Sequence, residues 1–125
     1  MASELRVNTL KDASGNNSVA LSYVAEGTAK VRSTSEADSS IVESFGVSSI
    51  SDTATGIDTI NYSSNFSAAK AQQPVAFTVP GTDVAERPRG STATTGSMII
   101  VNEEVDTSTD RDPDELFFTA HGDLA

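Results

Sequence analysis

The sequence contains no cysteine, no tryptophan and one histidine, and it has no long apolar run. Without cysteine, neither a disulfide framework nor a thiolate metal site can form. The longest apolar run is Met98-Ile99-Ile100-Val101, whereas a membrane-spanning helix needs about 20 apolar residues. The N-terminal segment MASELRVNTL has no apolar signal core. We therefore expect neither secretion through a signal peptide nor anchoring in a membrane.

Basic residues are also scarce, because 18 acidic residues stand against 8 basic ones and the formal net charge is -10. A nucleic-acid-binding protein neutralises phosphates with Lys and Arg, and no basic stripe with interleaved aromatic residues is present. The sequence therefore predicts no binding to nucleic acid or to an anionic membrane. The chain is short and its apolar content is low, so its core is thin. Contacts between subunits would add burial, which favours a homo-oligomer.

Short stretches in which apolar and polar residues alternate occur along most of the chain. This period of two is typical of half-buried strands. One such stretch covers 3–10, a turn-rich segment KDASGNNS follows at 11–18, and 19–23 alternates again, which predicts a hairpin. Residues 45–50 and 57–62 flank an Asp/Gly turn and predict a second hairpin. Further strands are expected over 28–32, 75–79, 98–105 and 116–120.

The segments between these strands are polar. We expect 33–40 to be a loop, with a short helix over 35–43 as the alternative, and 65–73 to contain one helical turn. The segment 82–97 is expected to be a long connection, and connections of this length are functional or disordered. Residues 106–115 form an acidic linker.

The fold class that these patterns predict is all-β, as a single small β-sandwich or Greek-key barrel with an extended N-terminal arm and long loops. No sustained 3.6-residue pattern and no internal repeat is visible. We expect residues 1–18 to form the N-terminal arm, with a first strand and turn, and residues 19–125 to form the β domain. The N-terminal segment belongs either to the domain's own sheet or to an arm that uses Leu5 and Val7 to add to a neighbour's sheet edge.

Few residues suggest catalysis. A Ser/His/Asp triad would have to use His121, and no Gly-x-Ser-x-Gly elbow is present. Phosphate-binding and dinucleotide-binding glycine motifs are also missing from the sequence. We therefore expect a protein that is not an enzyme and has no cofactor, with His121 as a surface imidazole.

An acidic run provides the best metal candidate. Asp110, Asp112 and Asp114 have the alternate spacing that hard cations such as Ca²⁺ prefer. Arg111 interrupts the run, and Glu115 takes the place of the glycine that turns a calcium loop. The alternative is a solvated acidic loop.

The one local cationic spot is Arg87-Pro88-Arg89-Gly90. We expect Arg87 and Arg89 either to dock onto an acidic patch of a neighbouring subunit through charge-assisted hydrogen bonds, or to belong to an exposed flexible loop.

Two segments resemble a known class of proteins. Residues 3–18, SELRVNTLKDASGNNS, resemble the N-terminus of tail-fibre-like and other virion structural proteins of marine and cyanobacterial phages. Residues 44–62 resemble the β-hairpin module that follows in those proteins. In this chain Val31-Arg32-Ser33 replaces the usual aromatic stretch, and the half from Pro80 onward has no counterpart. The resemblance implies a virion component, usually a homotrimer, and it carries over no catalytic residue.

We therefore expect a capsid decoration or cement protein, or a short head fibre, that is assembled in the host cytoplasm and resides in the virion. Its partners would be its own copies and the major capsid protein. The alternative is a tail-associated fibre or adaptor that binds tail proteins. A more distant alternative is a glycan-binding or glycan-cleaving module, which would need exposed Tyr23 and Tyr62 or a pair of catalytic carboxylates.

Overall fold

The computed structural model describes residues 9–11, 13–15, 18–21, 24, 27–81 and 85–125. Leu5 and Val7, the arm residues proposed for partner binding, lie outside the described residues. The strands are β1 Thr9–Lys11, β2 Ser18–Ala20, β3 Ala29–Glu36, β4 Ile41–Phe45, β5 Val47–Ala54, β6 Ile57–Tyr62, β7 Gln73–Val79, β8 Glu86–Ala93, β9 Ser97–Glu104 and β10 Glu115–His121. A 3₁₀ turn, η1, covers Ala69–Ala71.

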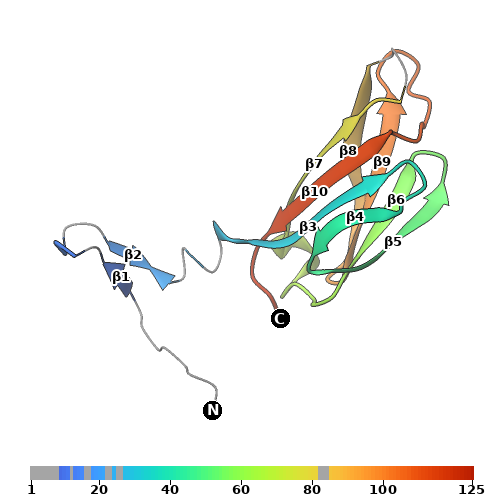
Figure 1. Cartoon of the computed structure of the whole chain (residues 1–125). Coiled ribbons are helices and arrows are strands. Elements are labelled where there is room, and N and C mark those ends of the chain that lie inside the picture. Colours follow the sequence, from blue (N-terminus) through green and yellow to red (C-terminus); the bar gives the residue numbers. More distant parts are fainter. Residues whose placement is uncertain (1–8, 12, 16–17, 22–23, 25–26, 82–84) are drawn as a thin grey trace.

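Eight of these strands form two four-stranded antiparallel sheets that pack face to face (Figure 1). The first sheet has the order β4-β3-β10-β7 and the second has the order β5-β6-β9-β8. The chain passes from one sheet to the other after β4, β6, β7 and β9. The expected small all-β sandwich is confirmed. Within the described part of the chain, no helix is both long and apolar enough to cross a membrane.

The core lies between the sheets and follows the alternation of the strands. The ring of Phe66, in the connection after β6, is fully buried and meets the ring of Tyr62 edge-on, with 5.3 Å between centroids. Because side chains alternate across a strand, every second residue of β9 and β10 points inward. The buried core cluster consists of Val31, Ile60, Tyr62, Phe66, Met98, Ile100, Leu116, Phe118 and Ala120.

Gly46 is the single residue between β4 in one sheet and β5 in the other. Its φ is +71°, and a β-carbon added there would lie 2.2 Å from Lys30 O. Only glycine accepts both the left-handed angle and this close approach. The expected strand over 45–50 is therefore divided, with Phe45 ending β4 and Val47 beginning β5.

The structure corrects two of the expected loops. Residues 33–36 belong to β3, so the expected loop over 33–40 shrinks to the turn at 37–40, and no helix forms over 35–43 because β4 begins at Ile41. The alternation was hidden because the buried positions there are serines. The long connection expected over 82–97 contains β8, an edge strand whose charged side chains and Pro88 obscure the pattern.

The predicted N-terminal hairpin is confirmed, with β1 and β2 antiparallel and Leu10 opposite Val19. Its second strand is shorter than expected, because β2 ends at Ala20 and Leu21 is helical. The hairpin extends beyond one end of the sandwich, clear of both sheets (Figure 1).

Candidate interaction face

The outer face of the sheet β4-β3-β10-β7 collects exposed apolar side chains. On β7 the residues Pro74, Ala76 and Thr78 are turned toward the core and are partly buried, so the alternate residues point outward. The register of the ladder places the outward residues of all four strands in cross-strand rows. We call this surface the aromatic face, and it consists of Arg32, Thr34, Glu36, Glu43, Phe45, Val75, Phe77, Val79, Glu115, Phe117 and Thr119.

Two phenylalanines stack at the β7 side of the aromatic face. Phe77 and Phe117 are direct cross-strand partners on β7 and β10. Their rings stack with 4.6 Å between centroids and 8° between planes. Despite this contact, Phe77 and its neighbour Val75 are each 58% exposed. The pair is therefore ordered by the sheet but not covered by the chain.

A depression of about 200 Å³ lies beside the stacked rings and is bounded on its far side by Arg32 and Glu43. These two side chains form an ion pair between β3 and β4, and both are more than half exposed. Small-molecule pockets usually have volumes of about 300–1,000 Å³. The size and open position of this depression suit one or two apolar side chains of another protein segment.

The outer face of the second sheet has a different character. Its outward residues on β5 and β6 are mostly polar. We call this part of the surface the polar face, and it consists of Ser49, Ser51, Thr53, Thr59 and Asn61. Asn61 Nδ2 donates to Ser49 Oγ at 3.1 Å, and the hydroxyls of Thr53 and Thr59 are 3.2 Å apart. The sandwich is therefore polarised, because the first outer face exposes large apolar side chains, whereas on the second Ile57, Ile99 and Val101 are partly or fully buried and the β5–β6 side chains bond to one another.

The structure places Arg87 and Arg89 on β8 beside Glu103 of β9, so they are not part of a flexible loop. Arg87 Nε donates to Glu103 Oε1 at 2.9 Å, and Arg89 Nε lies 3.4 Å from Glu103 Oε2. Burial of Glu103 opposes its ionisation, but the hydrogen bond from Arg87 and the charges of both arginines outweigh burial and lower its pKa. The sequence led us to expect an acidic patch on a neighbouring subunit, whereas the structure supplies an acidic partner, Glu103, within the same chain.

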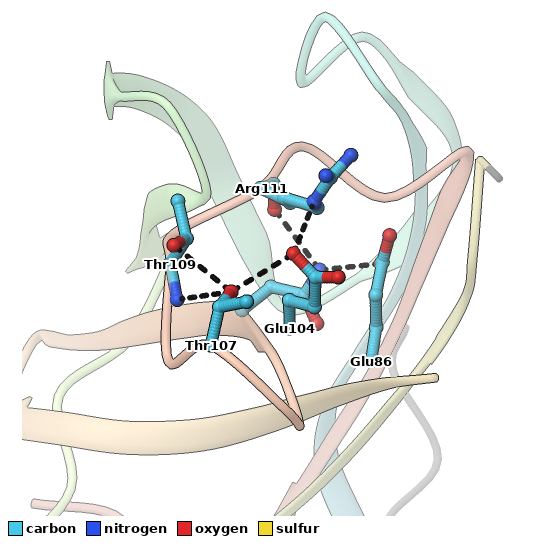
Figure 2. Close-up of polar contacts among 6 residues, drawn as sticks. Glu86, Glu104, Thr107, Thr109 and Arg111 are labelled. Atoms are coloured by element: carbon cyan, nitrogen blue, oxygen red, sulfur yellow. Dashed lines mark hydrogen bonds and ion pairs between the residues drawn. The ribbon is translucent and has the colours of Figure 1, made fainter. Parts of the chain in front are cut away.

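The acidic linker is held by contacts with Glu104 and Asn102 (Figure 2). Arg111 Nε donates to Glu104 Oε2 at 3.1 Å, and the Thr107 hydroxyl lies 2.9 Å from the same oxygen. Asn102 Nδ2 reaches both Glu86 Oε2 at 2.7 Å and Arg111 O at 2.9 Å. Arg111, which interrupts the acidic run, therefore supplies a counter-charge from inside the linker.

The three aspartates proposed as metal ligands are used separately. Asp112 accepts a hydrogen bond from the backbone N–H of Gly56, Asp110 forms a backbone bridge with Glu103, and Asp114 N donates to Val79 O at 2.9 Å. Among the described residues, no group of three or more His, Asp or Glu side chains is arranged to hold a metal ion. The alternate spacing of Asp110, Asp112 and Asp114 does not produce the cation site that it predicted.

Asp112 is close enough to Asp58, a residue of β6, for its charge to act on the Asp58 carboxyl group. Burial raises the pKa of Asp58, and the charges of Asp52 and Asp112 add to this, against a hydrogen bond from the Ser39 hydroxyl.

The other candidate residues are engaged in the fold. His121 Nδ1 lies 3.0 Å from the carbonyl oxygen of Gly27, an acceptor, so this contact uses the Nδ1-protonated tautomer. Tyr62 is buried, and its hydroxyl donates to Gln72 Oε1 at 2.5 Å, so it offers no platform for a sugar ring. Tyr23 lies outside the described residues.

The sequence interpretation did not single out Phe77 and Phe117. One signal was available, because consecutive residues of a strand point to opposite faces and Phe117-Phe118 cannot both enter the same core. Which of the two points outward depends on the register, and Phe118 proves to be the buried one.

No family model, curated protein or solved structure matches the chain. Its function is therefore inferred from the aromatic face, the charge distribution and the resemblance of residues 3–18.

Proposed function

We propose that this chain is a non-enzymatic structural protein that assembles by burying its aromatic face against a neighbouring subunit. The observation that carries the proposal is the position of the phenylalanines. The chain has five, and three of them, Phe45, Phe77 and Phe117, lie on the outer face of one sheet. A chain with a thin core that leaves most of its phenylalanines outside needs another surface to cover them.

Contiguous apolar patches on a soluble protein mark interaction sites, and aromatic residues are enriched at the centre of such sites. Charged side chains flank the apolar residues of β7 and β10, with Arg32 and Glu43 on β3 and β4 and with Glu115 at the start of β10. Apolar side chains flanked by polar ones are the usual organisation of a protein interface. The polar face on the opposite side of the sandwich would remain in water.

As the biological context we propose a phage virion, in which the chain is a homotrimeric capsid decoration or cement protein, or a short head fibre, bound to the major capsid protein. The resemblance of residues 3–18 supports this context. A sandwich with one adhesive and one polar face suits attachment to a shell, and the net charge of -10 suits an exposed position. A tail-associated fibre or adaptor is the alternative.

The number of copies per particle distinguishes the two positions. Quantitative mass spectrometry of purified particles should find a copy number comparable with that of the major capsid protein if the chain covers the shell. A copy number comparable with that of tail proteins would favour the tail. Particles that lack the protein should lose resistance to heat and osmotic shock if it acts as a cement, and unchanged resistance would contradict that role.

Two isosteric substitutions test whether the aromatic face drives assembly. Val75→Thr changes the aromatic face, whereas Val105→Thr makes the same change at an exposed valine in the turn after β9. Burial of one valine contributes about 1.5 kcal/mol or more, so Val75→Thr should weaken association about tenfold in sedimentation velocity. Val105→Thr should leave association unchanged.

Equal association of both variants and the unmodified protein would contradict assembly through this face. If the protein stayed monomeric and bound glycans through Phe77, a glycan-binding module would be favoured instead. That outcome would show as binding to a glycan array that is lost in Phe77→Thr.

A further inference from the structure

We propose that the β1–β2 hairpin of one copy packs Leu10 and Val19 onto the aromatic face of a second copy. This inference rests on the proposed function and names the segment that covers the face.

The hairpin carries an exposed apolar pair. Leu10 and Val19 are direct cross-strand partners, and they are 43% and 38% exposed. An isolated two-stranded hairpin is marginally stable in water, because it has no third strand and no surface to pack on. The hairpin lies beyond the end of the sandwich, where neither sheet of its own chain covers it, so an apolar surface of another copy would stabilise it (Figure 1).

The aromatic face offers a surface of the matching kind. The depression of about 200 Å³ beside Phe77 and Phe117 is open to solvent and has the size for short aliphatic side chains. The hairpin stands clear of this face in its own chain, which favours a second copy as the acceptor (Figure 1). The outer face of the second sheet offers no comparable apolar surface, because its apolar residues Ile57, Ile99 and Val101 are partly or fully buried, whereas Val75 and Phe77 are each 58% exposed.

Charge also favours this pairing. Residues 9–20 carry one lysine, Lys11, and one aspartate, Asp12, and therefore no net charge, whereas the chain as a whole carries -10. The aromatic face carries one arginine and three glutamates, and two of these, Glu36 and Glu115, are opposite each other across the β3–β10 ladder. Like charges in directly opposed positions repel, so an approaching cation would relieve them.

The absence of cysteine makes a cross-linking test direct. We would prepare full-length Val19→Cys, Val75→Cys and Ser51→Cys as single variants. Val75 lies on the aromatic face beside Phe77, and the substitution at Val75 leaves the Phe77–Phe117 pair unchanged. Ser51 lies on the polar face and is the matched control. Equimolar mixtures would be treated with a mild oxidant and separated by non-reducing electrophoresis, and a double variant, Val19→Cys/Val75→Cys, would be oxidised at high dilution.

The mixture of Val19→Cys and Val75→Cys should give a mixed disulfide dimer as the main product, at least fivefold above the mixture of Val19→Cys and Ser51→Cys. Equal yields in the two mixtures would overturn the inference. An intrachain disulfide in the diluted double variant, without a mixed dimer, would also overturn it, because the hairpin would then dock on its own chain. If association is weakened by Val75→Thr but no mixture cross-links preferentially, assembly through the aromatic face stands and the hairpin is not its occupant.

Discussion

Phe77 and Phe117 face each other across the β7–β10 ladder with their rings 4.6 Å apart and nearly parallel, yet they lie on the outside of the sandwich. Phe118, the next residue of β10, is buried in the core. Adjacent phenylalanines of one strand thus contribute to different parts of the molecule. One stabilises the fold, and the other belongs to a surface that the fold displays.

This division predicts unequal effects on stability. Phe77→Thr should lower the free energy of unfolding by about 0.5–1.5 kcal/mol, the contribution of an exposed aromatic pair. Phe66→Ala, which empties a fully buried site, should lower it by about 3–5 kcal/mol. Urea denaturation followed by circular dichroism measures both values at a protein concentration that keeps the chain monomeric. Similar losses for the two variants would mean that Phe77 belongs to the core.

The all-β class could be predicted from the sequence because alternation needs only local information. It succeeded where apolar residues occupy alternate positions, as in 57–62 and 75–79, although the apolar residues of 75–79 prove to face outward. It failed in β3, where serines occupy the inward positions, and in β8, an edge strand with polar residues on both faces. The sheet order was not accessible, because β10 pairs with β3 and β7 through contacts distant in sequence.

The candidate site was less accessible than the fold. The sequence pointed to charged residues, and the structure engages Arg87 and Arg89 with Glu103 within the chain. The aromatic face depends on register, since a shift of one residue would exchange Phe117 for Phe118. A surface that arises from the register of four strands is not visible in any one of them.

The serines on the inner face of β3 provide a second prediction. The hydroxyls of Ser33 and Ser35 are buried and have no hydrogen-bond partner among the described residues. A buried hydroxyl without a partner loses its hydration without compensation. Ser35→Ala should therefore raise the free energy of unfolding by about 1 kcal/mol, as measured by urea denaturation.

Ser49→Ala is the control for this substitution, because Ser49 is exposed on the polar face. It should change stability by less than about 0.5 kcal/mol. A loss of stability in Ser35→Ala would show that its hydroxyl has a partner.

Glu103 provides a prediction about the stability of the fold at low pH. The hydrogen bond from Arg87 and the charges of Arg87 and Arg89 outweigh burial and hold the pKa of Glu103 below its ordinary value. A carboxylate whose pKa is lower in the folded state stabilises the fold above its unfolded pKa, and this contribution is lost as the pH falls through the folded pKa. Glu103→Gln should be less stable than the unmodified protein at neutral pH, and the difference should shrink toward about pH 3.

Glu43→Gln is the matched control, since the Arg32–Glu43 pair is exposed on both sides and exposed pairs contribute little. Urea unfolding of the three proteins between about pH 7 and about pH 3 gives the comparison. A constant difference between Glu103→Gln and the unmodified protein would show that the charge of Glu103 is not responsible.

Tyr62 provides the corresponding prediction for alkali. Its hydroxyl donates to Gln72 Oε1, and Gln72 Nε2 in turn donates to Thr94 O at 2.7 Å. Burial raises the pKa of Tyr62 above its ordinary value of about 10. Above that pH the unfolded chain releases the phenolic proton while the folded chain keeps it, so stability falls as the pH rises. Below about pH 10 the contribution is fully present.

Tyr62→Phe separates the contribution of the hydrogen bond to Gln72 from the effect of phenol ionisation at high pH. At neutral pH the variant should lose about 1 kcal/mol, because Gln72 Oε1 loses its donor. Above about pH 10 the unmodified protein should lose stability more steeply than the variant, which has no phenol to ionise at this position. Parallel pH profiles for the unmodified protein and Tyr62→Phe would mean that the phenol ionises as readily in the fold as in the unfolded chain, which is incompatible with its buried hydrogen bond to Gln72.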